Sequence, residues 1–134
     1  MTASSLSLRS ATTAAWLLAG ALAVPACAIA DVDEGQELFE LECSICHVAL
    51  PEQKAAGPAL EGVVDRQAGK LEGYLYSEAV RASEVVWTED MLDTYLVRPQ
   101  DAIPGMRSTF KGMPLAEDRA SLIEYLKSIR TAAP

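Results

Sequence analysis

Two cysteines and a histidine lie within five consecutive residues, Cys43-Ser44-Ile45-Cys46-His47. Thiols three positions apart on one helical turn can each form a thioether with one vinyl group of a single porphyrin. The imidazole of the next residue, His47, would then reach the iron from the proximal side. The motif therefore predicts one covalently attached haem c, with Cys43 and Cys46 as the thioether residues and His47 as the proximal iron ligand.

Other uses of this pattern fit the chain less well. A structural zinc site needs four ligands, and the chain has one histidine and three cysteines. A thioredoxin-like pair usually lies in a βαβ unit, and the sequence shows no β-rich run. A disulfide between Cys43 and Cys46 would close a very tight loop and would leave His47 unexplained.

The first thirty residues have the pattern of a secretory signal peptide. Arg9 precedes an apolar stretch over 11–24, and Ala28-Ile29-Ala30 has the small residues of a cleavage site, so the mature chain would begin at Asp31. The apolar stretch is shorter than the roughly 20 residues of a membrane-spanning helix. We therefore expect export to the bacterial periplasm. Two alternatives remain open, namely lipidation of Cys27 and an uncleaved signal that anchors the protein.

Residues 31–134 would form one small domain whose own core is marginal, and a buried haem would supply much of the missing apolar surface. The full chain has 19 acidic and 11 basic residues and a net charge of −8. Such a charge makes nucleic acid a poor partner. It favours a redox partner with a basic or largely apolar patch, unless the acidity serves only solubility. We expect a monomer.

Helical patterns and long loops predict an all-α domain. A first helix over 34–43 would have Asp33 as its N-cap and Gln36 in the capping-box position. Ser77 would cap a short helix to residue 82, and Thr88 a longer one over 89–98 that ends before Pro99. Segments 48–73 and 100–112 are predicted as loops. The last helix would begin near Pro114 and pack across the first through an apolar stripe of Leu115, Leu122, Ile123, Leu126 and Ile129.

Together these residues resemble the class I cytochromes c of the mitochondrial and bacterial c2 type. The resemblance covers nearly all of residues 31–134. Beyond the attachment motif it depends on Gly35, Phe39, Gly57-Pro58, Arg66, Gly73-Tyr74-Leu75-Tyr76-Ser77, Trp87, Tyr95, Pro104-Gly105 and Leu122-Ile123-Glu124-Tyr125-Leu126-Lys127.

The resemblance implies a class I cytochrome c fold around one covalent haem. It implies that the Pro58 carbonyl accepts the proton of the proximal imidazole, which would fix the tautomer and raise the basicity of the ligand. It places Arg66 and Trp87 near the haem propionates, Tyr76 in the haem pocket and Tyr95 on the distal side.

The distal loop departs from the family pattern, P-G-T-x-M-x-F, whose methionine is the sixth iron ligand. Here the loop reads Pro104-Gly105-Met106-Arg107-Ser108-Thr109-Phe110, so a serine occupies the ligand position. A hydroxyl is a poor ligand for ferrous haem iron. Met106 is our predicted distal ligand. Met113, Lys111 at high pH, and a five-coordinate or water-bound iron are the alternatives.

A second departure concerns docking. The lysine ring of the mitochondrial proteins is replaced here by Glu42, Gln100, Asp101, Pro114 and Leu115, with only Arg107 and Lys111 basic nearby. We therefore do not expect that family's electrostatic recognition of partners.

The predicted function is one-electron transfer between periplasmic or membrane-facing redox proteins, including a membrane-bound oxidase or reductase, without enzymatic activity. One alternative is a haem protein whose open distal site binds small gases or reacts with peroxide. Another is a haem subunit of a larger oxidoreductase.

Overall fold

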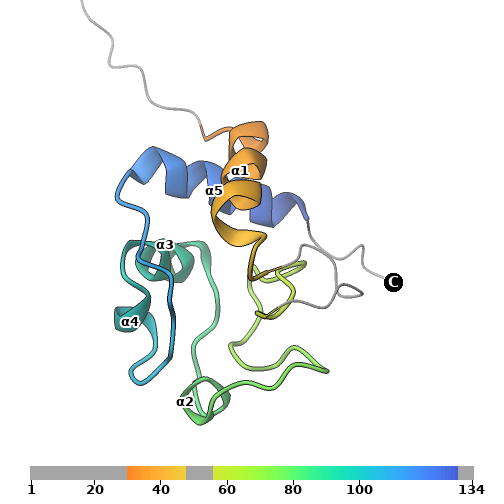
Figure 1. Ribbon diagram of the computed structural model, residues 1–134, viewed down its shortest axis with the longest axis vertical. Helices are drawn as coiled ribbons and strands as arrows, with labels where there is room; N and C mark the ends of the chain where they lie inside the picture. The colour runs from red at the N-terminus through yellow and green to blue at the C-terminus, as the bar shows by residue number, and fades with distance from the viewer. Residues whose placement is uncertain (1–29, 48–55, 130–134) are drawn as a thin grey trace, which may run out of the picture.

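The computed structural model describes residues 30–47 and 56–129, which form helices joined by long loops (Figure 1). Helix α1 (Val32–Leu38) continues into one turn of π-helix, η1 (Phe39–Cys43). The remaining helices are α2 (Glu78–Arg81), α3 (Glu89–Val97), α4 (Pro99–Ala102) and α5 (Ala116–Ser128). The single β-bridge of the described part joins Gln67 and Val86. The prediction of an all-α domain is confirmed.

The first helix begins earlier than predicted. Asp31, whose backbone is extended, caps it by accepting a hydrogen bond from the Asp33 amide at 2.8 Å. The predicted N-cap, Asp33, is wrong because this residue already lies in the first turn. Gln36 does not complete a capping box, since its side chain donates to Glu40 one turn further on. By contrast, Thr88 caps α3 as predicted and accepts from the Met91 amide at 3.2 Å.

The loop predicted over 100–112 is partly helical. Pro99 ends α3, as predicted, but it also occupies the first position of α4, where its missing N–H costs no hydrogen bond. At the other end of this segment, α5 starts at Ala116, two residues after Pro114. Leu115 is the N-cap residue of α5 and its side chain is 51% exposed, so it does not belong to the buried stripe.

Helices α1 and α5 cross in direct contact, as expected (Figure 1). Gly35 lies at the crossing, where a Cβ atom would come within 2.0 Å of the Ser121 carbonyl oxygen and 2.8 Å of the Tyr125 Cβ. Only glycine allows the two backbones to approach this closely. One turn further, the Phe39 and Tyr125 rings pack with their centroids 5.3 Å apart. The crossing therefore fixes the direction in which the chain enters the attachment motif.

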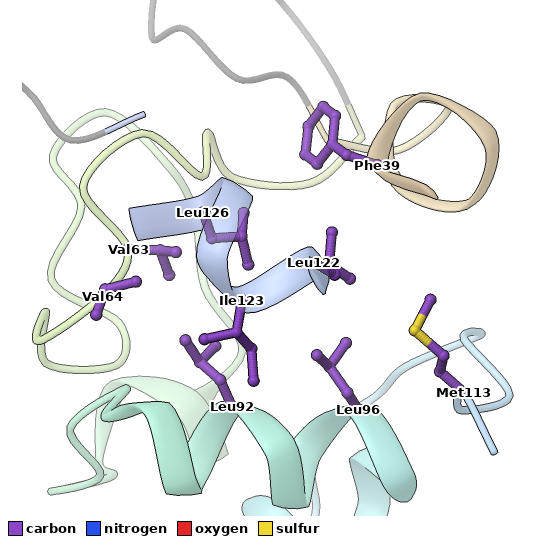
Figure 2. Close-up of a cluster of buried hydrophobic side chains, with 9 residues drawn as sticks. All are labelled: Phe39, Val63, Val64, Leu92, Leu96, Met113, Leu122, Ile123 and Leu126. Atoms are coloured by element: carbon purple, nitrogen blue, oxygen red, sulfur yellow. The ribbon is translucent and has the colours of Figure 1, made fainter. Parts of the chain in front are cut away.

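A cluster of buried apolar side chains lies between this helix pair and α3. Figure 2 shows its nine members, Phe39, Val63, Val64, Leu92, Leu96, Met113, Leu122, Ile123 and Leu126. It joins η1, α3 and α5 to the loop after residue 56 and to Met113. The three α5 residues of the cluster are the central part of the predicted stripe.

Arg119 of α5 is a buried cation, 9% exposed, that connects three segments. Its Nε donates to Asp93 of α3 at 2.6 Å, and its Nη1 donates to the carbonyls of Met113 and Pro114, each at 3.0 Å. The end of the distal loop is thus tied to α3 and α5 at one point. Among the described residues, no helix is both long and apolar enough to cross a membrane.

Candidate functional site

A cavity of about 700 Å³ opens beside the attachment motif. Its volume falls in the range of sites for cofactor-sized ligands. Ten residues singled out from the sequence line it: Cys43, Cys46, His47, Pro58, Arg66, Tyr76, Trp87, Tyr95, Met106 and Ser108. They come from η1, α3 and the loops around α2 and α4, so the fold brings together residues up to 65 positions apart.

The attachment motif is held by its own backbone. The amides of Cys46 and His47 donate to the Cys43 carbonyl at 3.1 and 2.8 Å, which closes a turn directly after η1. Both thiols are free and partly buried. Burial, followed by the charge of Glu42 and the neighbouring Cys46, raises the pKa of Cys43 to about 11. No group of three or more His, Cys, Asp or Glu side chains that could hold a metal ion occurs in the described part of the chain.

The imidazole of His47 is oriented by the residue pair Gly57-Pro58. Its Nδ1 lies 2.9 Å from the Pro58 carbonyl oxygen. Because a carbonyl can only accept, Nδ1 must carry the proton, and Nε2 keeps the lone pair that a metal ion needs. A Cβ at Gly57 would come within 2.5 Å of His47 Cε1, so glycine is required for this close approach. The predicted bond between His47 and Pro58 is present.

Arg66 places a cation in the cavity lining. Its guanidinium donates to the carbonyls of Glu61 at 2.9 Å and Ala59 at 3.0 Å. Burial lowers the pKa of Arg66, and burial raises the pKa of Tyr76, while the Arg66 charge offsets part of the latter shift. The Arg66 carbonyl in turn accepts from the Trp87 amide at 2.9 Å. This corner therefore offers a positive charge and aromatic groups to an anionic substituent of a bound ligand.

Tyr95 and Ser108 meet in another part of the lining, with their hydroxyl oxygens 3.4 Å apart. Ser108 Oγ also accepts from the Phe110 amide at 3.2 Å. The Tyr95 ring packs edge-on against Trp87 and is stacked on Phe110, with centroid distances of 5.4 and 6.4 Å. Burial raises the pKa of Tyr95, and the hydrogen bond with Ser108 offsets part of that rise.

The structure separates the two methionines considered as distal ligands. Met106 lines the cavity and packs against Ala68, Val80 and Ile103. Met113 is not brought to the site. It is 6% exposed, belongs to the core cluster (Figure 2) and is absent from the cavity lining. Lys111 lines the cavity and its side chain is exposed. Ligation by Met106 remains a prediction.

Several site residues were missed from the sequence. Ile45 and Leu75 line the cavity although they are strongly exposed, and Phe110 holds the Tyr95 ring. Tyr74 donates its hydroxyl to the Ala56 carbonyl at 2.8 Å, which ties the loop after residue 73 to the loop before Gly57. Each of these residues lies inside a segment that the sequence analysis names, but its side chain was given no role there.

The residues present fit a covalently bound haem. Two free thiols, an imidazole with an available Nε2 and a cation share one cavity whose lining is largely apolar. When bound, the haem supplies an iron that changes its charge by one electron. The two thiols would attach the group, and the Pro58 carbonyl would orient its imidazole ligand.

Comparison with known proteins gives a consistent result. The family described as Cytochrome c matches residues 32–130. Cytochrome c2 of Rhodopila globiformis is 40% identical over 100 residues, which cover 75% of this chain and 94% of the relative. Cytochrome c of Tetrahymena pyriformis is 39% identical over 99 residues, covering 74% of this chain and 89% of the relative.

A third relative is longer than this chain. Cytochrome c-type cyt cy of Rhodobacter capsulatus is 39% identical over 105 residues, which cover 78% of this chain but 52% of the relative. The attachment motif, the cavity and these relatives together identify the chain as a member of the cytochrome c family, a monohaem electron-transfer protein with one covalent haem c rather than an enzyme.

Proposed function

We propose that this protein carries single electrons between redox proteins in the bacterial periplasm. Cys43 and Cys46 attach the haem through thioethers, and His47 is the proximal iron ligand. The observation that carries the proposal is the hydrogen bond of 2.9 Å from His47 Nδ1 to the Pro58 carbonyl, which leaves Nε2 free at the cavity that both thiols line.

We place the docking face at the mouth of the cavity. Ile45 and Leu75 line the cavity and are 84% and 95% exposed, among the most exposed large apolar side chains of the described residues. Exposed apolar groups beside a redox centre are suited to brief contact with another protein surface. Electron transfer would occur through this opening, where the least protein separates the cavity from a partner.

The charge of this face differs from that of the whole chain. The lining contains Arg66, Arg107 and Lys111 but only one acidic residue, Glu42, whereas the chain as a whole has a net charge of −8. A partner therefore needs no basic patch here. We propose a largely apolar docking surface on a soluble or membrane-bound oxidase or reductase. A dependence of the electron-transfer rate on ionic strength as steep as that of oppositely charged partners would contradict this.

The direct test of the function is to express the full chain in the periplasm of a bacterium that attaches c-type haem. We expect the mass of one haem to be added covalently and the iron to be reduced and reoxidised reversibly by one electron. Haem that can be extracted intact with acidified organic solvent would refute the proposal.

We further propose that the mature protein begins at Asp31. The family match starts at residue 32, and the Asp31 amide donates to Ser121 Oγ of α5 at 3.1 Å, so the first residue after the predicted cleavage site already contacts the last helix. Residues 1–29, including Cys27, lie outside the described residues. Intact-mass measurement of the secreted protein tests this: a mass that includes a lipid on Cys27, or the whole signal, would replace the proposal by an anchored form.

A further inference from the structure

The hydroxyl pair of Tyr95 and Ser108 has one proton more than its protein partners use. Ser108 Oγ can accept two hydrogen bonds and donate one, and the Tyr95 hydroxyl can do likewise, with one proton to give. The amide of Phe110 takes one acceptor position of Ser108, and the contact between the two hydroxyls uses one of their two protons. No hydrogen bond within residues 30–47 and 56–129 takes the second.

The direction of the bond between the hydroxyls does not change this count. If Tyr95 donates to Ser108, the serine proton remains, and if Ser108 donates to Tyr95, the phenol proton remains. Both side chains line the cavity whose wall also carries His47. Burial keeps the pKa of Tyr95 above its ordinary value, so the phenol stays a donor at neutral pH.

The pair is also held in place. The Tyr95 ring lies between Trp87 and Phe110, and Ser108 Oγ is fixed by the Phe110 amide. The Phe110 ring therefore supports the phenol and its amide supports the serine. A donor with fixed geometry in a largely apolar cavity is the arrangement with which haem proteins stabilise the outer atom of a small iron ligand.

We propose that this cavity binds a small exogenous ligand whose outer atom accepts a hydrogen bond from the Tyr95–Ser108 pair. The chemical class is that of diatomic and triatomic molecules or anions, such as dioxygen or cyanide. This inference rests on the proposed haem attachment and adds ligand binding to the electron carrier. A neutral hydroxyl is a poor ligand for ferrous haem iron, whereas it can donate a hydrogen bond to a small ligand.

The position of Met106 agrees with this assignment. Its side chain packs against Ala68, Val80 and Ile103, so it completes a second apolar cluster at the cavity wall. Met113 is buried in the core and does not reach the lining.

The test uses the ferric holoprotein with cyanide as the probe, followed by the visible spectrum. We expect a high-spin spectrum before cyanide is added and a binding rate that rises linearly with cyanide concentration, because no protein ligand has to leave first. Ser108→Ala or Tyr95→Phe alone still leaves one hydroxyl proton at the cavity, whereas the double variant that combines them should weaken cyanide binding about two- to tenfold, the range of one neutral hydrogen bond. Ser108→Met should give a low-spin spectrum and slow the binding strongly.

Two matched controls lie outside the lining. Tyr125→Phe and Ser128→Ala remove the same hydroxyl groups from α5, and both should bind cyanide like the wild type. Unchanged binding in the double variant Tyr95→Phe with Ser108→Ala would overturn the role of the pair. A low-spin wild type that becomes high-spin in Met106→Ala would overturn the inference and leave the electron carrier intact. Absence of covalent haem in the wild type would instead refute the proposed function.

Discussion

The side of the cavity that carries His47 and the side that carries Ser108 are built in different ways. On the first, the motif residues are consecutive in sequence, and their orientation is fixed by one carbonyl eleven residues on, that of Pro58. On the second, Tyr95 and Ser108 are thirteen residues apart and depend on the packing of α3 against a loop. The first side is specified locally, whereas the second is specified by tertiary contacts, so changes to the two should fail in different ways.

The strongest way to break the first side is to remove both thiols. In the double variant Cys43→Ala with Cys46→Ala we expect loss of covalent haem and of most of the folded structure. Without the haem, the apolar side chains that line the cavity of about 700 Å³ would be exposed to water, and a domain of this size has little stability to spare.

Intact mass and circular dichroism measure this outcome. A double variant that melts cooperatively at the wild-type temperature would show that the described core is stable without the cofactor. Tyr125→Phe, which leaves the motif untouched, serves as the control for expression and export.

A smaller change tests the orientation of the imidazole. Gly57→Ala places a Cβ within 2.5 Å of His47 Cε1, so the ring or the loop must move and the bond to Pro58 is lost. We expect a loss of stability of about 1–3 kcal/mol, as for overpacking elsewhere. The reduction potential should rise, because an imidazole without this bond is less basic and stabilises the oxidised iron less.

Pro58→Ala is the matched variant, since it keeps the backbone carbonyl that accepts from His47. Chemical denaturation and a redox titration should show a wild-type potential in Pro58→Ala. Equal potentials in Gly57→Ala and the wild type would mean that the Pro58 carbonyl does not tune the imidazole.

A third test, with an expected loss of stability similar to that of Gly57→Ala, addresses the second side through Arg119. Arg119→Ala removes the bond to Asp93 and leaves the carbonyls of Met113 and Pro114 without their donor. We expect the free energy of unfolding to fall by about 1–3 kcal/mol, because the Arg119 side chain is only 11% exposed and water cannot readily replace its hydrogen bonds. Hydrogen exchange should increase in the loop over 103–113 more than in the attachment motif.

Arg98→Ala removes an ion pair of the same type from the surface, where Arg98 and Asp101 are 69% and 55% exposed. Exposed ion pairs contribute little to stability, so the free energy of unfolding of this variant should stay within about 0.5 kcal/mol of the wild-type value. If both arginine variants were equally stable, Arg119 would not anchor the distal loop.

The same difference explains what could be predicted from the sequence. The attachment motif could be read directly from five consecutive residues, and the bond between His47 and Pro58 was expected from the family resemblance. Thr88 was found because a cap is a local signal, and Asp33 was chosen wrongly because Asp31 gives the same signal two residues earlier. Because acidic residues occur both at the N-cap and in the first turn of a helix, their presence does not show whether Asp31 or Asp33 is the cap.

The distal side could not be predicted in the same way. Whether Met106 or Met113 faces the cavity depends on which of them the core accepts, and Met113 packs there with Leu96 and Leu122. The pairing of Ser108 with Tyr95 and the position of Phe110 follow from how the loop lies against α3. The helix α4 was missed because a proline that ends one helix can also begin the next.

The hydrogen bond from the Asp31 amide to Ser121 also has a practical consequence. It fixes the beginning of the described chain beside α5, and neither Ala30 nor Asp31 lines the cavity. Figure 1 shows the start of α1 at one end of the molecule and α2, whose Val80 does line the cavity, at the other. A linker joined ahead of residue 30 would therefore hold the protein on an electrode or a fusion partner by the end remote from α2, with the side chains of Ile45 and Leu75 free to meet an electron donor.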